Sequence, residues 1–384
     1  MKQLNKHVHI VCPDIPLPSS GADMLDVLHQ ISCLHHAGYA IVLHCFHQEE
    51  DIDPDIGSLS DITQHIHLYT RNEGHKGVSM KHPYCVSSRC NPQLLENLLQ
   101  AEYPVLFQGM AATYYLPDLA EKGYTLAVRI NGIASELYDA SVKSEKSLFK
   151  KAYSFNEARL IKKWEEKISE QAVIITTTAN DRKKFHELYN GAEVICLSPF
   201  MPAPAITSKP GTGMYCLYYG DLSNHENEKA LKWLTDNVFS KIAVPLVVAD
   251  TCTTPITQED NHRESHICTV SNPASTELME LIQKAQLVLL PRCHNKGFDK
   301  RLLQALETGR FCICNDYMAE GTGLEKLFII ANDNGEMIDI IDLYFSRSFT
   351  EEDIKERTTL LNACLTPQDS LHTLVKVLEQ KSIL

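Results

Sequence analysis

Four basic residues lie close together in one short segment of a chain that is otherwise acidic. They fall within ten positions of one another, whereas the whole chain has a formal net charge of −13; they are Arg292, Lys296, Lys300 and Arg301. The segment follows a short apolar run, and Asp299 within it favours the N-cap of a following helix. Since a helix N-terminus attracts anions, cations beside it are suited to bind a diphosphate. The alternative interpretation is a solvated basic turn that offsets the acidity of the chain.

Two glycines indicate further ligand contacts, because glycine lets a ligand approach the backbone closely. Gly220 follows the apolar run 214–219, and Gly21 comes after the first apolar run, 7–12. An ordinary turn between a strand and a helix explains a single glycine equally well. The sequence contains no GxGxxG after a strand and no P-loop motif, which removes the main support for a dinucleotide oxidoreductase or a P-loop NTPase. The motif GxSxG is also absent, which argues against an α/β-hydrolase.

Paired histidines could also bind a metal ion. His7 and His9 lie on one face of a strand, as do His65 and His67, and His44 precedes a cysteine. No CxxC or HExxH accompanies them, and no acidic residue sits at ligand spacing. Histidines in the core or at a sheet edge therefore explain the pattern better than zinc.

The composition is that of a globular protein large enough for two domains. Hydrophobic residues make up 44% and charged residues 22% of the 384 residues. An acidic chain repels nucleic acid unless its basic residues gather locally, so general nucleic-acid binding is not expected. No apolar run reaches the roughly 18–20 residues that span a bilayer, and the N-terminal segment resembles a strand rather than a signal peptide. The 13 cysteines lie mostly in apolar segments, which indicates reduced thiols and a cytoplasmic protein.

Strand-like and helix-like segments alternate along the whole chain, which predicts parallel sheets covered by helices. In the first half, strand patterns lie at 7–12, 41–46, 66–69, 105–108, 125–129, 173–176 and 194–197. In the second half they lie at 214–219, 246–249, 267–270, 287–290, 311–314 and 327–330, before a helical tail. Ligands of such sheets bind beyond the carboxyl ends of the strands, where the basic segment and Gly220 fall.

A segment rich in proline and glycine separates the two halves. Residues 199–213 contain four prolines and two glycines, which interrupt regular structure and indicate a linker. We therefore expect an N-terminal domain at 1–198 and a C-terminal domain at 214–350. Helices at 351–384 are expected to pack back on the cleft between the domains.

Motifs along nearly the whole chain resemble those of one enzyme family. Residues 14–21 are similar to its proline- and glycine-rich acceptor loop, and 35–39 to its L-x-x-x-G-H helix end. The segment 271–291 is similar to the stretch that leads to its donor loop, and 295–309 resembles its donor signature, E-G-F-G-x-x-x-x-E-A-x-A-x-G. The family is that of the retaining, nucleotide-sugar-dependent glycosyltransferases of the GT-B fold, group 1 or family four, in a divergent bacterial branch.

The resemblance implies an α/β fold of two Rossmann-like α/β/α domains that face a cleft. It implies transfer of a sugar from a nucleotide diphosphate donor to a glycan, lipid-linked or protein acceptor, without a metal or other cofactor. The protein would work in the cytoplasm, and an acceptor in the membrane would bring it to the inner face of that membrane. It would act alone or as a homo- or hetero-oligomer. On the acceptor side the catalytic residues are expected to be Arg129 and Asn131, with Gly21 as an acceptor contact. The expected donor contacts are Gly220, Asn272, Ser275, Lys296, Gly297, Lys300 and Arg301.

Several charged positions of the family are replaced in this chain. The two glutamates of the donor signature fall on Lys296 and Gln304, and its glycine-arginine pair falls on Gly220-Asp221. Asn131 stands where relatives carry the histidine of R-x-H-N-x-E. These replacements support a second hypothesis, a pseudo-enzyme that keeps the fold and acts as a binding or heteromeric partner. A GT-B epimerase or phosphorylase is a third.

Overall fold

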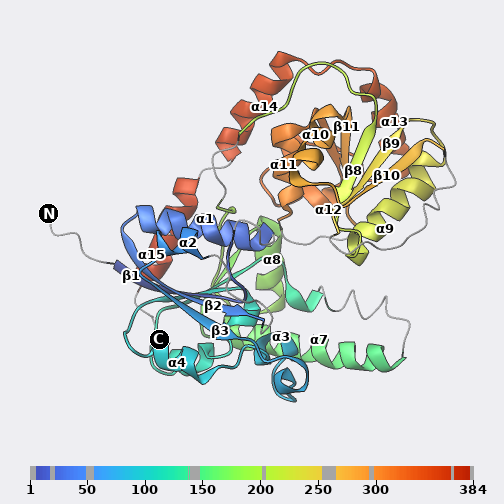
Figure 1. The fold of residues 1–384 in the computed structure, drawn as a ribbon. Helices are drawn as coiled ribbons and strands as arrows, with labels where there is room; N and C mark the ends of the chain where they lie inside the picture. The colour runs from blue at the N-terminus through green and yellow to red at the C-terminus, as the bar shows by residue number, and fades with distance from the viewer. Residues whose placement is uncertain are drawn as a thin grey trace. The chain divides into compact units, whose positions relative to one another are not determined.

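The chain divides into two compact units, each built on its own sheet (Figure 1). The computed structural model describes residues 6–17, 22–48, 56–136, 138, 148–200, 205–252, 265–293, 298–364 and 367–380. The first unit comprises Met1–Pro202, Lys296–Phe298 and Thr366–Leu384, and the second comprises Ala203–Asn295 and Asp299–Leu365. The C-terminal segment therefore belongs to the first unit, although it follows the second unit in the sequence.

The first unit contains a seven-stranded sheet in which all neighbouring strands are parallel. The strand order is β3-β2-β1-β4-β5-β6-β7. The strands are β1 (Lys6–Cys12), β2 (Tyr39–His47), β3 (His65–Thr70), β4 (Val105–Gln108), β5 (Leu126–Ile130), β6 (Val173–Thr176) and β7 (Val194–Cys196). All residues of β4 and β5 are buried, which is typical of central strands covered on both faces.

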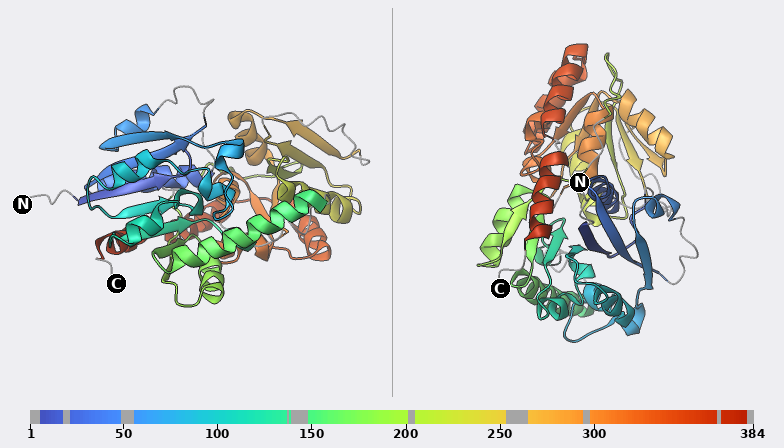
Figure 2. Two further views of the ribbon diagram at one scale, coloured as in Figure 1. Left: turned by 90° about the horizontal axis from the view of Figure 1, so that it is seen from below. Right: turned by 90° about the vertical axis from the view of Figure 1, so that its left-hand side faces the viewer.

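Helices cover both faces of this sheet and form two cores (Figures 1 and 2). The longer helices are α1 (Ala22–His36), α7 (Leu148–Ser169), α8 (Ala179–Leu188) and α15 (Pro367–Glu379). The shorter ones are α2 (Gly57–Ser60), α3 (Tyr84–Ser87), α4 (Pro92–Leu98), α5 (Leu116–Ala120), η1 (Gly74–Gly77) and η2 (Met110–Ala112). One core joins Ile10, Ile31 and Leu374, and the other joins Phe107 and Trp164. The last helix, α15, is thus part of the first unit's core.

The second unit contains a six-stranded parallel sheet in the order β10-β9-β8-β11-β12-β13. Its strands are β8 (Cys216–Gly220), β9 (Leu246–Asp250), β10 (Ile267–Ser271), β11 (Leu287–Leu290), β12 (Phe311–Cys314) and β13 (Ile329–Ile330). Its helices are α9 (His225–Leu234), α10 (Ser275–Lys284), α11 (Lys300–Thr308), α12 (Asp316–Ala319), α13 (Asn334–Phe345) and α14 (Glu351–Cys364). The later part of the proline-rich segment is attached to this unit, because the amides of Thr207 and Ser208 donate to the carbonyl oxygen of Glu307. Phe200, near its start, belongs to the core of the first unit.

The predicted α/β fold with two Rossmann-like units is confirmed, and the differences are local. The short helices α3, α4 and α5 lie where no helix was predicted, since four to seven residues show too little periodicity. The strand predicted at 327–330 shrinks to β13 because Glu325–Leu327 forms a 3₁₀ turn. Helix α9 ends at Leu234 and continues as a π-helical turn, Thr235–Phe239.

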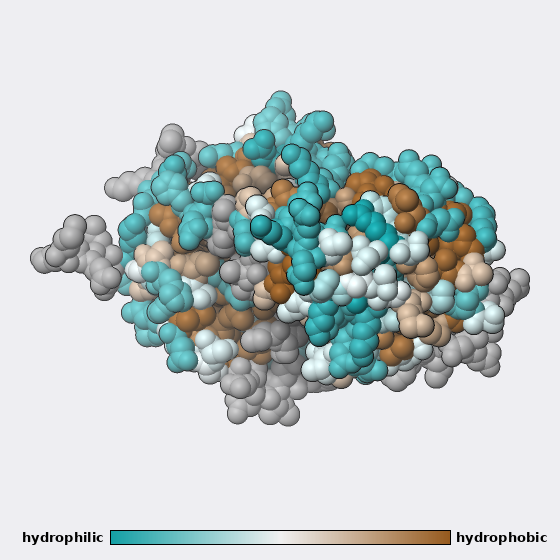
Figure 3. Space-filling view, turned by 90° about the horizontal axis from the view of Figure 1, so that it is seen from above, coloured by the Kyte–Doolittle hydropathy of each residue, from teal (hydrophilic) through white to brown (hydrophobic). Residues whose placement is uncertain are grey.

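The surface mixes hydrophilic and hydrophobic residues, as the face in Figure 3 shows. None of the 13 cysteines forms a disulfide, and many of them are buried in the sheets. Within the described ranges, no helix combines the length and apolarity that crossing a bilayer requires.

Replacing Leu374 by Ala should lower the free energy of unfolding by about 2–5 kcal/mol, because this fully buried side chain would leave a cavity in the first unit's core. Lys376→Ala, on the exposed side of the same helix, is the matched control and should change stability by less than about 0.5 kcal/mol. Urea denaturation followed by circular dichroism measures both. Equal stability of the two variants would show that α15 does not support this core.

Candidate functional site

The carboxyl edge of the second sheet brings together the loops that the sequence singled out. Because all its strands are parallel, the loops after β8, β9, β10 and β11 leave the same edge. The carboxylate of Asp250, at the end of β9, accepts hydrogen bonds from the amides of Leu222 and Cys252, both at 3.0 Å. This carboxylate therefore holds the loop after β8 next to the loop after β9.

Asp299 lies between two arginine side chains at this edge. Its Oδ2 is 2.7 Å from Nη2 of Arg292 and 2.8 Å from Nη2 of Arg301. All three side chains are between 11% and 14% exposed. Asp299 is also the N-cap of α11, as predicted, since its Oδ1 accepts from the backbone amide of Arg301 at 2.9 Å. Two guanidinium groups share one carboxylate, so this cluster carries one net positive charge.

The charges of the cluster stabilise one another. Burial opposes ionisation of Asp299, but Arg301 and Arg292 hold the pKa of its carboxyl well below its usual range. Burial lowers the pKa of Arg292. For Arg301, the charge and hydrogen bonds of Asp299 outweigh burial and raise the pKa of the guanidinium. All three groups are therefore charged at neutral pH, and the N-terminus of α11 adds partial positive charge.

Gly220 allows Arg301 to lie against the end of β8. A Cβ at Gly220 would be 2.7 Å from Nη1 of Arg301, so any larger residue would displace the guanidinium. The same Nη1 donates to the carbonyl oxygen of Tyr219 at 3.0 Å, and the Tyr219 hydroxyl donates to the carbonyl oxygen of Arg301 at 2.9 Å. The structure thus brings together two of the predicted donor residues, and the space over Gly220 holds an arginine of the chain itself.

The other described donor candidates lie at the same edge and are exposed. Lys300 is the first residue of α11, and Ser275 is the first residue of α10. The N-cap of α10, Ala274, offers no side-chain oxygen to its first amides. Asn272 has a φ of 46° and is the one non-glycine residue with positive φ in the described ranges. Three further candidates lie outside the described residues: Gly21, Lys296 and Gly297.

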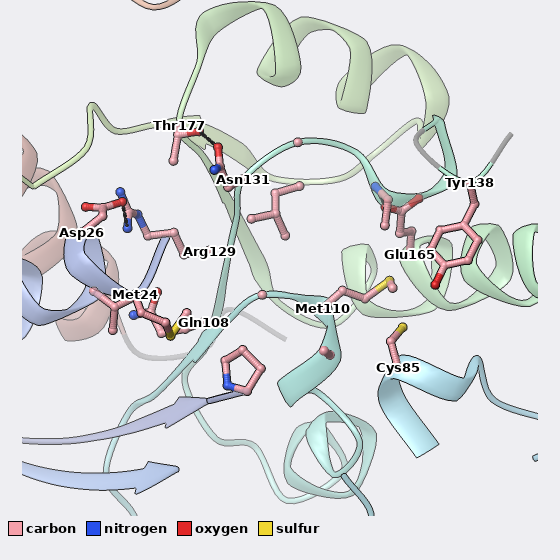
Figure 4. Close-up of a pocket in the computed structure, with 17 residues that line it drawn as sticks. Met24, Asp26, Cys85, Gln108, Met110, Arg129, Asn131, Tyr138, Glu165 and Thr177 are labelled. Atoms are coloured by element: carbon pink, nitrogen blue, oxygen red, sulfur yellow. Dashed lines mark hydrogen bonds and ion pairs between the residues drawn. The ribbon is translucent and has the colours of Figure 1, made fainter. Parts of the chain in front are cut away.

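The first unit contains a pocket of about 300 Å³ at the carboxyl edge of its sheet (Figure 4). Both predicted catalytic residues, Arg129 and Asn131, line its polar end together with Asp26, Gln108 and Thr177. The opposite end is lined by Cys85, Met110, Tyr138 and Glu165. The pocket therefore combines hydrogen-bonding groups at one end with apolar and weakly acidic groups at the other.

A buried ion pair fixes the polar end. Nη1 of Arg129 lies 2.6 Å from Oδ2 of Asp26, and the guanidinium lies over the ring of Phe200, 5.5 Å from its centroid. The other oxygen of Asp26 accepts from the amide of Phe200 at 2.6 Å. Nε and Nη2 of Arg129 are buried and have no hydrogen-bond partner among the residues described. The neighbouring Asn131 accepts from the hydroxyl of Thr177 at 2.8 Å.

Glu165 supports the opposite end, and the sequence reasoning missed it. It is 2% exposed and accepts hydrogen bonds from the amide of Ala134 at 2.8 Å and the hydroxyl of Tyr189 at 2.7 Å. Burial raises the pKa of its carboxyl. In the sequence, Glu165 lies between Trp164 and Ile168, on the side of the helix that the apolar pattern predicts to be buried. A carboxylate at a buried position is the signal that indicates a functional or supporting role for this residue.

Burial also suppresses ionisation of two neutral groups in the pocket. It raises the pKa of the Cys85 thiol to about 11 and that of the Tyr138 hydroxyl to about 12. Both groups are therefore protonated at neutral pH. With Arg129 and Asp26 balancing each other, the pocket has little net charge, in contrast to the cationic edge of the second unit.

One histidine of each pair, His9 and His67, joins a cluster around the buried His44. Nδ1 of His9 lies 3.0 Å from Nε2 of His44, and Nδ1 of His44 lies 2.9 Å from the Tyr69 hydroxyl, which accepts from Asn97. His67 stacks on His44. In the part of the chain that the structure describes, no three His, Cys, Asp or Glu side chains are placed to hold a metal ion.

Solved structures match nearly the whole chain at low sequence identity. TarM is 10% identical, with a TM-score of 0.69 over 99% of this chain and 100% of its own. A UDP-forming trehalose-phosphate synthase from Burkholderia xenovorans is 9% identical, with a TM-score of 0.62 over 99% and 100%. HepE from Anabaena, in complex with UDP and glucose, is 10% identical, with a TM-score of 0.58 over 97% and 99%. No protein-family model matches the sequence, and no curated protein matches it significantly. These similarities show a shared fold, in agreement with the predicted GT-B architecture.

Asp299→Asn should lower the free energy of unfolding by about 3–5 kcal/mol at neutral pH, because two buried guanidinium groups lose their carboxylate. The difference from the native chain should shrink below about pH 4, by about 1.4 kcal/mol per pH unit. The unfolded chain then takes up a proton at this residue while the folded chain, whose Asp299 pKa is depressed, does not.

Urea denaturation at a series of pH values measures this difference. Asp236→Asn, at an exposed position of the same unit, is the control and should show no comparable pH-dependent difference. A stability loss for Asp299→Asn that is the same at pH 7 and pH 3 would contradict the charge pairing.

Proposed function

We propose that the chain transfers a sugar from a nucleotide diphosphate donor to a glycan, lipid-linked or protein acceptor. The second unit binds the donor and the first unit binds the acceptor. The fold supports this proposal, since HepE shares it and was solved with UDP and glucose. The difference in charge between the two candidate sites supports it further, because a diphosphate is anionic and an acceptor hydroxyl is neutral.

The arginine pair around Asp299 is the observation that carries the proposal. When the bond between sugar and diphosphate breaks, negative charge grows on the departing nucleotide. Fixed cations in a partly buried site stabilise such charge without having to rearrange. Arg301 and Lys300 are our candidates for contact with the diphosphate, and Lys296 and Gly297 belong to the same proposed loop. In this proposal the protein's own cations act in place of a metal ion.

Arg301 also compensates for a replaced position. Asp221 follows Gly220, where the resembling enzymes carry arginine, and its Oδ1 accepts from the amide of Ser223 at 2.9 Å. The carboxylate of Asp221 is therefore used to shape the turn after β8. Nη1 of Arg301, which is 82 positions beyond Tyr219 in the sequence, lies at the carbonyl of Tyr219 and supplies the positive charge at that point. The remaining donor contacts of the proposal are Asn272 and Ser275, for the base or ribose.

The pocket of the first unit is the proposed acceptor site. Its volume of about 300 Å³ is at the small end of ligand pockets and suits one sugar unit. Nε and Nη2 form one edge of the Arg129 guanidinium, and such an edge suits two neighbouring oxygen atoms. Arg129 and Asn131 are thus proposed to orient the acceptor hydroxyl, with Gly21 as a further contact, because correct orientation contributes much of the rate of such a transfer. A location in the cytoplasm and an assembly with other chains stay predictions.

Calorimetry with UDP should detect binding to the full chain, and Lys300→Gln should weaken it about two- to fivefold. The expected size follows from the roughly 0.5–1 kcal/mol that an exposed cation contributes beside an anion. Lys355→Gln removes an equally exposed cation of the same unit and should leave the affinity unchanged. The absence of heat with UDP and with the other common nucleoside diphosphates would contradict the proposed donor site.

Gly220→Ala should weaken UDP binding about tenfold, because the added Cβ displaces the Arg301 guanidinium. Gly335→Ala is the control, since its Cβ would meet only the flexible side chain of Asp333 at 3.2 Å. Calorimetry measures the affinities, and melting temperatures establish that both variants are folded. A Gly220→Ala variant with native affinity would remove Arg301 from the donor site.

Turnover separates the transferase from the pseudo-enzyme. The purified chain, incubated with radiolabelled nucleotide sugars and candidate acceptors, should release the nucleoside diphosphate and label an acceptor. A chain that binds UDP but consumes none of the donors would be a binding protein of the same fold.

A further inference from the structure

The helix α7 (Figure 2) carries four exposed cations in its second half. Its cations recur at positions that share one side of a helix, while the opposite side, with Trp164, is buried; they are Arg159, Lys162, Lys163 and Lys167. None of the four forms an ion pair with any residue that the structure describes. The same helix exposes two aromatic side chains, Tyr153 at 52% and Phe155 at 66%.

A loop with exposed apolar and basic side chains lies next to α7. Val78 is 60% exposed and Met80 is 93% exposed, and Lys76 and Lys81 are exposed beside them. The loop is held against the helix at its end, because the ring of His82 packs on Trp164 with centroids 4.9 Å apart. We call the exposed side of α7 together with loop 76–81 the α7 face.

Few carboxylates offset the charge of the α7 face. Glu166 and Glu170 are exposed on the helix, and Glu73 beside the loop is paired with Arg71 at 3.4 Å. The α7 face therefore carries six cations and two unpaired carboxylates, whereas the whole chain has a formal net charge of −13. Such a local reversal of sign attracts an anionic surface that the rest of the chain repels.

We propose that the α7 face binds the surface of a membrane that contains anionic lipids. Lysine and arginine side chains pair with lipid phosphates, and exposed aromatic and methionine side chains enter the boundary between headgroups and acyl chains. A soluble polyanion such as nucleic acid would use the cations but leaves Met80 and Phe155 without a partner. The proposal concerns α7 and its neighbouring loop alone and does not depend on sugar transfer.

Vesicle sedimentation of the full chain tests the proposal. The chain should bind vesicles of phosphatidylcholine with about one third phosphatidylglycerol and should not bind vesicles of phosphatidylcholine alone. High salt should release it, because the attraction between exposed charges is screened. Equal binding to both kinds of vesicle, or binding to neither, would overturn the proposal.

Variants identify the surface. Lys162→Gln combined with Lys163→Gln should weaken vesicle binding by roughly tenfold or more, since each cation near the surface contributes about fivefold. Phe155→Ser should also weaken it, whereas Lys232→Gln combined with Lys355→Gln, at exposed positions of the second unit, should not. Vesicle binding that the α7 variants leave unchanged would overturn the assignment to this face.

Two further measurements distinguish membrane binding from binding of a soluble polyanion and from loss of the donor site. Binding to heparin but to no vesicle would indicate a soluble polyanion in place of the membrane. UDP binding in solution should be the same for the native chain and all α7 variants, so a lost donor site and a lost membrane surface are distinguishable.

Discussion

A carboxylate buried between two guanidinium groups determines the geometry at the carboxyl edge of the second unit's sheet. Asp299 pairs with Arg292, which follows β11, and with Arg301 of α11, and it caps that helix as well. Removing Asp299 would leave two like charges close together and out of water, which is costly. The guanidinium groups are therefore fixed before any ligand arrives, and fixed charges stabilise an anion more effectively than mobile ones.

The first unit uses buried charge differently. Arg129 and Asp26 balance each other, and the raised pKa of Glu165 shows that burial favours its neutral form. The hydrogen bonds of Glu165 hold the turn at Ala134, which follows the strand that carries Arg129. One unit thus presents a cationic edge and the other a nearly neutral pocket with one polar end. This division agrees with an anionic donor on one unit and a hydroxyl acceptor on the other.

Two helices, α7 and α15, shape the pocket and the core of the first unit. α7 buries Trp164 and Glu165 on one side and exposes cations and aromatic rings on the other, so one helix shapes both the pocket and the α7 face. α15 returns from the end of the chain to complete the core around β1 and α1. The first unit therefore needs residues from both ends of the sequence.

The sequence by itself determined the repeating patterns of this protein. The alternation of strands and helices, the parallel sheets and the N-cap at Asp299 follow from neighbouring residues, because periodicity and capping depend on residues close together in the chain. Tertiary structure alone decided which side chains meet. The approach of Arg301 to Gly220, the pairing of Asp26 with Arg129 and the position of Glu165 join residues far apart in the chain. Periodicity carries no information about such contacts, because they arise only when separate strands and helices pack together.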